Sequence, residues 1–240
     1  MKNYGKFAAG LIAAWFLFTL SASALDGFKN DANRVGLAVA VAAVAPILVF
    51  ALWFASSEKF RQFALSLNPQ LLTFTQSWRI VGLTFVLLQA RGILPAIFAL
   101  PAGYGDMAIG MTATLVAWKL ANPVRRQSFI LWQLLGIADL ITAVSLGTTA
   151  RLLSPHSASM VAMTVLPLSL VPTFLVPLFL MFHVICIAQA RTWKTASDET
   201  APNKTEPVHY PAVKCGMTTD LKTRSTRDKV VGTGTFLTKA

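Results

Sequence analysis

Long apolar runs separated by short polar segments dominate the first 190 residues. A helix that crosses the hydrocarbon core of a bilayer needs about 20 mostly apolar residues. Five runs come close to this length and a sixth exceeds it, at residues 7–25, 35–55, 78–98, 104–121, 129–146 and 160–190. The pattern therefore predicts an all-α fold, in which residues 1–190 form a polytopic transmembrane helical bundle of about six spans.

The segment between the second and third predicted spans has a different pattern. In residues 57–67, Phe60, Phe63 and Ala64 recur at helical spacing while basic residues face elsewhere. An Asn-Pro pair at 68–69 then ends the pattern. Two interpretations stay open: an amphipathic helix that lies along the inner leaflet with its basic side toward anionic headgroups, or an ordinary linker.

The last apolar stretch, 160–190, carries Pro167, Pro172 and Pro177. Each proline removes a backbone donor and clashes with the preceding turn, so the helix should bend or break there. One interpretation is a single long span that is kinked and tilted, since proline is common in membrane helices. The other is a discontinuous helix that lines a cavity, as in some transporters.

The positive charges predict the orientation of the bundle. With the N-terminus inside, the inner segments hold 16 lysines and arginines and the outer loops hold 3. This bias favours a topology with both termini in the cytoplasm, and most tryptophans fall near the span ends that it places inside. The first span also fits a secretory signal peptide, with Ala22-Ser23-Ala24 as a cleavage site.

Composition separates a tail from the bundle. Of all 240 residues 55% are hydrophobic and 13% are charged, about half the charged share of a soluble domain. Residues 191–240 nevertheless hold nine basic and five acidic residues, so we expect a disordered cytoplasmic tail. The net charge of +11 does not indicate nucleic-acid binding, because the basic residues form short clusters between apolar runs. The two cysteines form no metal or disulfide motif, and we expect no metal and no cofactor.

Ionisable residues inside a span cost roughly 2.5–3.5 kcal/mol each and mark candidate functional positions. Arg91 lies 13 residues beyond Trp78 and Asp139 lies 13 residues beyond Arg126, so both are expected at about 20 Å depth from the inner side. We therefore predict an Arg91–Asp139 pair with Gln89 nearby. The pair either fixes helix packing or binds a polar substrate or proton. A third interpretation is that Arg91 snorkels outward.

Three further polar residues fall at predicted span ends. Arg79 follows Trp78 at the inner boundary, where it can reach lipid phosphate. Asp106 is expected to cap the helix that starts after an outer turn. His183, near the inner end of the last span, is expected to be a hydrogen-bonded packing residue. Gly105 and Gly110 are expected to let helices approach closely.

Four stretches resemble a known group of proteins. They are Gln76-Ser77-Trp78-Arg79 with Gly82, then Gly92-Ile93-Leu94-Pro95, then Phe98-Ala99-Leu100-Pro101-Ala102-Gly103-Tyr104-Gly105-Asp106, and Trp132-Gln133-Leu134-Leu135-Gly136-Ile137-Ala138-Asp139-Leu140. Together they are similar to uncharacterised bacterial multi-span membrane proteins over about residues 68–147. The resemblance implies a bacterial inner-membrane location and carries no activity.

Three classes of function stay open. The first is a small-solute transporter or ligand-binding membrane protein, with its site around Arg91, Asp139 and Gln89. The second is a structural or accessory subunit, whose partners are other membrane subunits or a second copy of the chain. The third is a membrane enzyme, for which the spans offer no nucleophile–base pair, metal cluster or paired carboxylates, so we assign no catalytic residue.

Overall fold

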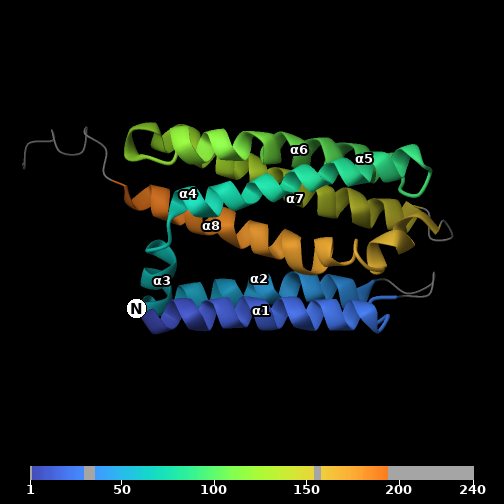
Figure 1. Cartoon of the computed structure of the whole chain (residues 1–240), viewed down its shortest axis with the longest axis horizontal. Coiled ribbons are helices and arrows are strands. Elements are labelled where there is room, and N and C mark those ends of the chain that lie inside the picture. The colour runs from blue at the N-terminus through green and yellow to red at the C-terminus, as the bar shows by residue number, and fades with distance from the viewer. Residues whose placement is uncertain (1, 30–35, 154–157, 194–240) are drawn as a thin grey trace, which may run out of the picture. The chain divides into compact units, whose positions relative to one another are not determined.

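The computed structural model describes residues 2–29, 36–153 and 158–193, and all regular structure in these ranges is helical (Figure 1). The elements are α1 (Lys2–Ala24), α2 (Leu37–Ser56), α3 (Glu58–Leu65), α4 (Pro69–Phe74), η1 (Thr75–Gly82), α5 (Leu83–Ala90), α6 (Ala96–Lys119), η2 (Pro123–Arg125), α7 (Arg126–Leu153), η3 (Ala158–Thr164), η4 (Val171–Leu175) and α8 (Val176–Thr192). The all-α prediction is confirmed for this part of the chain. The predicted tail lies outside the described residues from residue 194 onward.

Five helical segments of the described chain are long and apolar enough to cross a membrane. They are Tyr4–Ala24, Leu37–Ser56, Pro69–Ala90, Pro123–Leu153 and Val171–Thr192. Helix α6 is not among these five, although its 24 residues extend about 36 Å. Its sequence contains Asp106 and three glycines.

The third candidate span is one rod made of α4, η1 and α5, and its middle part, η1, is a 3₁₀ helix. It begins at Pro69 because the Asn68 side chain accepts hydrogen bonds from the first free N–H groups, as an N-cap does. It ends at Ala90, where Gly92 adopts a φ of 72° that side-chain-bearing residues disfavour. The prediction of a span at 78–98 is therefore wrong by about nine residues at its start.

The third candidate span ends in a Schellman motif with glycine in the left-handed position. The Gly92 N–H donates to the Gln89 carbonyl over 2.8 Å, and the Ile93 N–H donates to the Leu88 carbonyl over 2.9 Å. Pro95 then precedes the first turn of α6. A tight turn therefore joins the two helices, and α6 starts eight residues before the predicted 104.

The structure describes the backbone of both segments with open interpretations. Residues 57–67 do contain a helix, α3, whose Phe60 and Ala64 are buried while Lys59 is exposed. The last apolar stretch is discontinuous, because the short helix η3 ends at Thr164 and helical structure resumes only at η4. Element η4 is a single π-helical turn that continues directly into α8.

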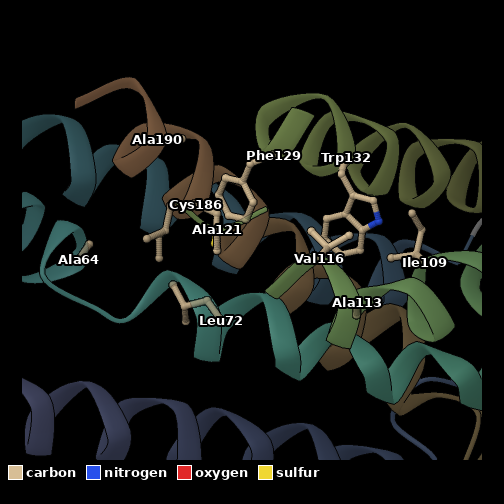
Figure 2. Packing of buried hydrophobic residues seen from close by; sticks show 11 residues of the cluster. Ala64, Leu72, Ile109, Ala113, Val116, Ala121, Phe129, Trp132, Cys186 and Ala190 are labelled. Carbon is tan, nitrogen blue, oxygen red and sulfur yellow. The ribbon is translucent and has the colours of Figure 1, made fainter. Parts of the chain in front are cut away.

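Helix α6 forms the centre of the packing. It lies along the whole third span, most extensively against η1, and its other neighbour is α7, which packs in turn on α8. Figure 2 shows Phe129 and Trp132 of α7 among the side chains of one buried apolar cluster. The buried members of this cluster are Ala64, Leu72, Ile109, Ala113, Val116, Ala121, Phe129, Trp132, Ile185, Cys186 and Ala190.

Helices α1 and α2 are peripheral. Both helices contact η4 and α3, and α2 also packs on α8, which separates the two helices from α6 in Figure 1. Every residue of α2 keeps at least partial exposure, as expected of a helix whose apolar side chains face lipid. Aromatic contacts hold the pair in place, with the Trp15 and Phe174 rings 4.7 Å apart.

Several helix ends lie at one end of the bundle. They are the start of α1, the end of α2, all of α3, the start of α7 and the end of α8. The Tyr4 and Phe63 rings lie 6.0 Å apart there, and Arg126 Nη1 donates to the Trp193 carbonyl over 3.4 Å. The Gln189 amide also donates to three carbonyls at the end of α3. We refer to this as the α3 end of the bundle.

Candidate functional site

Arg79 occupies the middle of the third candidate span. It is the eleventh of the 22 residues from Pro69 to Ala90, and its side chain is only 1% exposed. The neighbouring Trp78 is 71% exposed. The guanidinium thus lies inside the bundle, where its charge requires partners from the protein.

Two carboxylates and a histidine supply these partners. Arg79 Nε donates to Asp106 Oδ1 over 2.7 Å, and Nη2 donates to Asp139 Oδ2. Nη1 donates to the Gly136 carbonyl and to His183 Nε2, each over 3.3 Å. We call Arg79, Asp106, Asp139 and His183 the Arg79 centre.

The four members come from four different helices but share one height. Asp106 is the eleventh of the 24 residues of α6, Asp139 the fourteenth of the 28 residues of α7, and His183 the eighth of the 17 residues of α8. Each group therefore lies close to the middle of its helix. In a bilayer this height is the hydrocarbon core, where unpaired charge is most costly.

A directed chain of hydrogen bonds continues from His183 toward the α3 end. Arginine only donates, so His183 Nε2 must accept, and the ring proton then lies on Nδ1 and is donated to Gln133 Oε1. The Gln133 amide donates to Thr73 Oγ1 over 3.1 Å, and this hydroxyl lies 3.8 Å from the Cys186 sulfur. The contacts thus fix histidine in one neutral tautomer.

Glycines make room for the Arg79 centre. A Cβ atom on Gly105 would overlap the Asp139 carboxylate, and one on Gly136 would overlap the His183 ring. A Cβ on Gly82 would overlap Asp106. At Gly110 an added Cβ would lie 2.5 Å from the backbone of Ile80, so α6 and η1 touch there without side chains between them. The prediction that Gly105 and Gly110 allow close approach is confirmed.

The Arg79 centre carries more acidic than basic groups. Two carboxylates face one guanidinium, and the histidine is neutral in the tautomer described above. When both carboxylates are ionised, one negative charge is left for a cation or a proton to neutralise. The side chains of Asp106 and Asp139 are 16% and 15% exposed, whereas that of Arg79 is closed off, so access is from the carboxylate side.

The structure does not bring together the residues predicted to form the site. Arg91 is exposed and follows the last residue of α5, 12 residues beyond Arg79, the residue with which Asp139 pairs. Gln89 lies in the last turn of the same helix, so neither belongs to the Arg79 centre. The predicted Arg91–Asp139 pair is wrong because the third span starts at Pro69, which moves Arg91 out to its end. Asp139 is mid-span as predicted.

The three residues assigned to span ends are also mid-helix. Arg79 does not reach out to lipid phosphate, and Asp106 caps no helix, because α6 already begins at Ala96. His183 is hydrogen-bonded and fully buried, which agrees with its predicted packing role but not with its predicted place near the end of a helix. Two local signals in the sequence could have given the correct bounds of the third span. They are the Asn68-Pro69 pair at its start and the Gly92-x-x-Pro95 pattern after its end.

Sequence reasoning missed Gln133, Gly136 and Thr73. Both Gln133 and Thr73 are fully buried, and Gln133 links the histidine to the threonine. Among the residues the structure describes, no group of three or more His, Cys, Asp or Glu side chains could hold a metal ion.

Comparison with known proteins gives a family match that covers the region of the Arg79 centre. No curated protein and no solved structure matches the chain. One family model matches residues 32–191, a range that includes every member of the Arg79 centre and begins after α1. Because this range is two thirds of the chain, the protein belongs to the family described as "Domain of unknown function (DUF8737)".

Proposed function

We propose that the protein is an integral protein of the bacterial inner membrane with six spans and both termini in the cytoplasm. The sixth span is α6, whose length suffices and which packs between the third span and α7. Basic residues at the α3 end support this orientation, because positive charge concentrates on the cytoplasmic side. They are Lys6, Lys59, Arg61, Lys119, Arg125, Arg126 and Arg191, whereas Lys29, Arg91 and Arg151 lie toward the other end.

Within this membrane protein, the Arg79 centre is the proposed binding site for a small cationic solute or a proton that crosses the bilayer. The observation that carries the proposal is a guanidinium held mid-span by two partly exposed carboxylates. An ionisable residue at this depth persists when it serves packing or transport. The excess of one acidic group favours a positively charged ligand.

Irregular helices near the centre support transport over a static role. Arg79 lies in η1, a 3₁₀ segment inside an otherwise α-helical span, and such segments often mark hinges. The π-helical turn η4 precedes the helix that carries His183. Broken helices near a mid-membrane site are a recurring feature of transporters, since they can reposition the groups that bind the ligand.

The test is flux into vesicles that contain the purified protein. An imposed inside-negative potential should drive entry of protons, read with an entrapped pH dye, or of Na⁺, read as isotope uptake. Asp106→Asn and Asp139→Asn should abolish the entry, because each removes the acidic excess. Glu58→Gln, at an exposed ion pair with Arg61, is the matched control and should leave it unchanged. Folded protein with the flux of empty vesicles would overturn the proposal.

A second candidate is a structural or accessory subunit of a membrane complex. It is favoured by the completeness of the contacts, since protein groups accept bonds from all three nitrogens of Arg79. In that case the centre fixes the register of four helices and binds no ligand. Stable co-purification with other membrane proteins, together with absent flux, would select this function.

A further inference from the structure

An apolar cavity of about 250 Å³ lies on the other side of α8 from the Arg79 centre. Helices α1, α2, α3 and α8 line it together with Leu67, which follows α3, and every lining side chain is apolar. Since an apolar cavity excludes water, its occupant must be apolar where it contacts the wall. The cavity plays no part in the proposed transport.

The cavity is a narrow slot parallel to the helices. Its lining runs from Ala8 to Trp15 on α1, from Pro46 to Trp53 on α2 and from Leu178 to Ile185 on α8. Each stretch covers seven residue steps, or about 10 Å of helix. A volume of about 250 Å³ over this length leaves room for a single hydrocarbon chain. The slot begins at the α3 end and covers most of one leaflet, whose hydrocarbon is about 15 Å thick.

Aromatic rings form the end of the slot at α3. The Trp53 and Phe60 rings are stacked 4.1 Å apart, and Phe7 meets Trp53 edge-on at 6.1 Å. Aromatic side chains favour the membrane–water interface, so this end lies where lipid headgroups begin. A chain inside the slot would thus belong to a lipid of that leaflet.

Two exposed lysines are adjacent in sequence to the aromatic residues of this end. Lys59 adjoins Phe60 on α3 and is exposed, and Lys6 adjoins the turn of α1 that packs on Phe63. Arg61 is already paired with Glu58, which leaves the two lysines to face a headgroup. An acyl chain is equally apolar in the slot and in the bilayer, so the headgroup charge must provide the selectivity.

We propose that the slot holds one acyl chain of an anionic phospholipid, with its headgroup between Lys6 and Lys59. The proposal depends on the membrane placement and not on transport. It predicts one retained lipid for each protein molecule after purification in mild detergent. From membranes that contain phosphatidylglycerol and phosphatidylethanolamine, the retained lipid should be phosphatidylglycerol.

Filling the slot is the first test. Ala8 lines the cavity, whereas its neighbour Ala9 is exposed and does not, so Ala8→Phe and Ala9→Phe form a matched pair. Lipid bound to the purified protein, counted by native mass spectrometry, should fall at least tenfold in Ala8→Phe and stay at one in Ala9→Phe. Equal lipid content in the two variants would overturn the proposal.

Removing the charge is the second test, and it does not depend on tolerance of a bulky residue. The double variant Lys6→Gln/Lys59→Gln is reconstituted in nanodiscs that contain equal amounts of phosphatidylglycerol and phosphatidylethanolamine. It should still retain one lipid, but the ratio of bound phosphatidylglycerol to bound phosphatidylethanolamine should fall roughly 30-fold relative to the wild type. This equals about 1 kcal/mol for each lysine. A wild-type protein that retains no lipid, or retains both lipids equally, would contradict the proposal, whatever the flux assay shows.

Discussion

Replacing Arg79 by glutamine removes the only positive charge of the Arg79 centre. In the wild type the Arg79 guanidinium bonds both Asp106 and Asp139. The substitution leaves these two carboxylates inside the bundle without that positive charge. Removing one partner of a buried ion pair typically costs about 3–5 kcal/mol, because an uncompensated charge remains. We expect Arg79→Gln to reduce the free energy of unfolding by about this amount.

The two carboxylates predict how the cost combines in a double-mutant cycle. Asp139→Asn alone leaves the neutral pair of Arg79 and Asp106 and loses one charge-assisted hydrogen bond, which costs about 1.5–3 kcal/mol. In the background of Arg79→Gln, the same substitution removes a repulsion from Asp106. The double variant should therefore be less destabilised than the sum of the single variants, by at least about 1.5 kcal/mol.

The assay is equilibrium unfolding of the protein in mixed micelles, titrated with a denaturing detergent and followed by helical circular dichroism. Arg91→Gln is the control, because this exposed arginine should contribute within about 0.5 kcal/mol. If the cost of the double variant equals the sum of the costs of Arg79→Gln and Asp139→Asn within about 0.5 kcal/mol, the ion-pair reasoning is refuted. A cost for Arg91→Gln as large as that for Arg79→Gln would refute the register of the third span.

The remaining predictions concern a glycine and the topology. Gly136→Ala should cost about 1–3 kcal/mol in the same titration, because its Cβ overlaps the His183 ring. At Gly10 nothing lies within 4 Å of an added Cβ, so Gly10→Ala should be neutral or slightly stabilising, and a loss equal to that of Gly136→Ala would contradict the packing. In a cysteine-free background, Lys59→Cys and Lys29→Cys should react with an impermeant thiol reagent from opposite sides of the membrane. Labelling of both from one side would refute the topology.

Much of the fold follows from local sequence. The length of an apolar run decides whether it can span a membrane, which is why the first two helices were found within a few residues of their bounds. Asp139 was placed mid-span because the basic pair at Arg125 and Arg126 marks the start of α7. The end of the third span is also determined by local sequence, because Gly92 and Pro95 end the helix. The apolar residues on both sides of this turn nevertheless made the end of one helix and the start of the next look like a single run at 78–98.

The sequence determined that a few charged groups would lie among apolar helices, and the tertiary structure decided which of them meet. Arg79 pairs with Asp106 and Asp139 because glycines at 82, 105 and 136 let backbones approach at one height. The height of a residue depends on where its helix begins, and contact depends on a neighbour far along the chain. Hydrophobic length is a property of one segment, whereas the register between helices is a property of pairs, so periodicity and composition do not contain it.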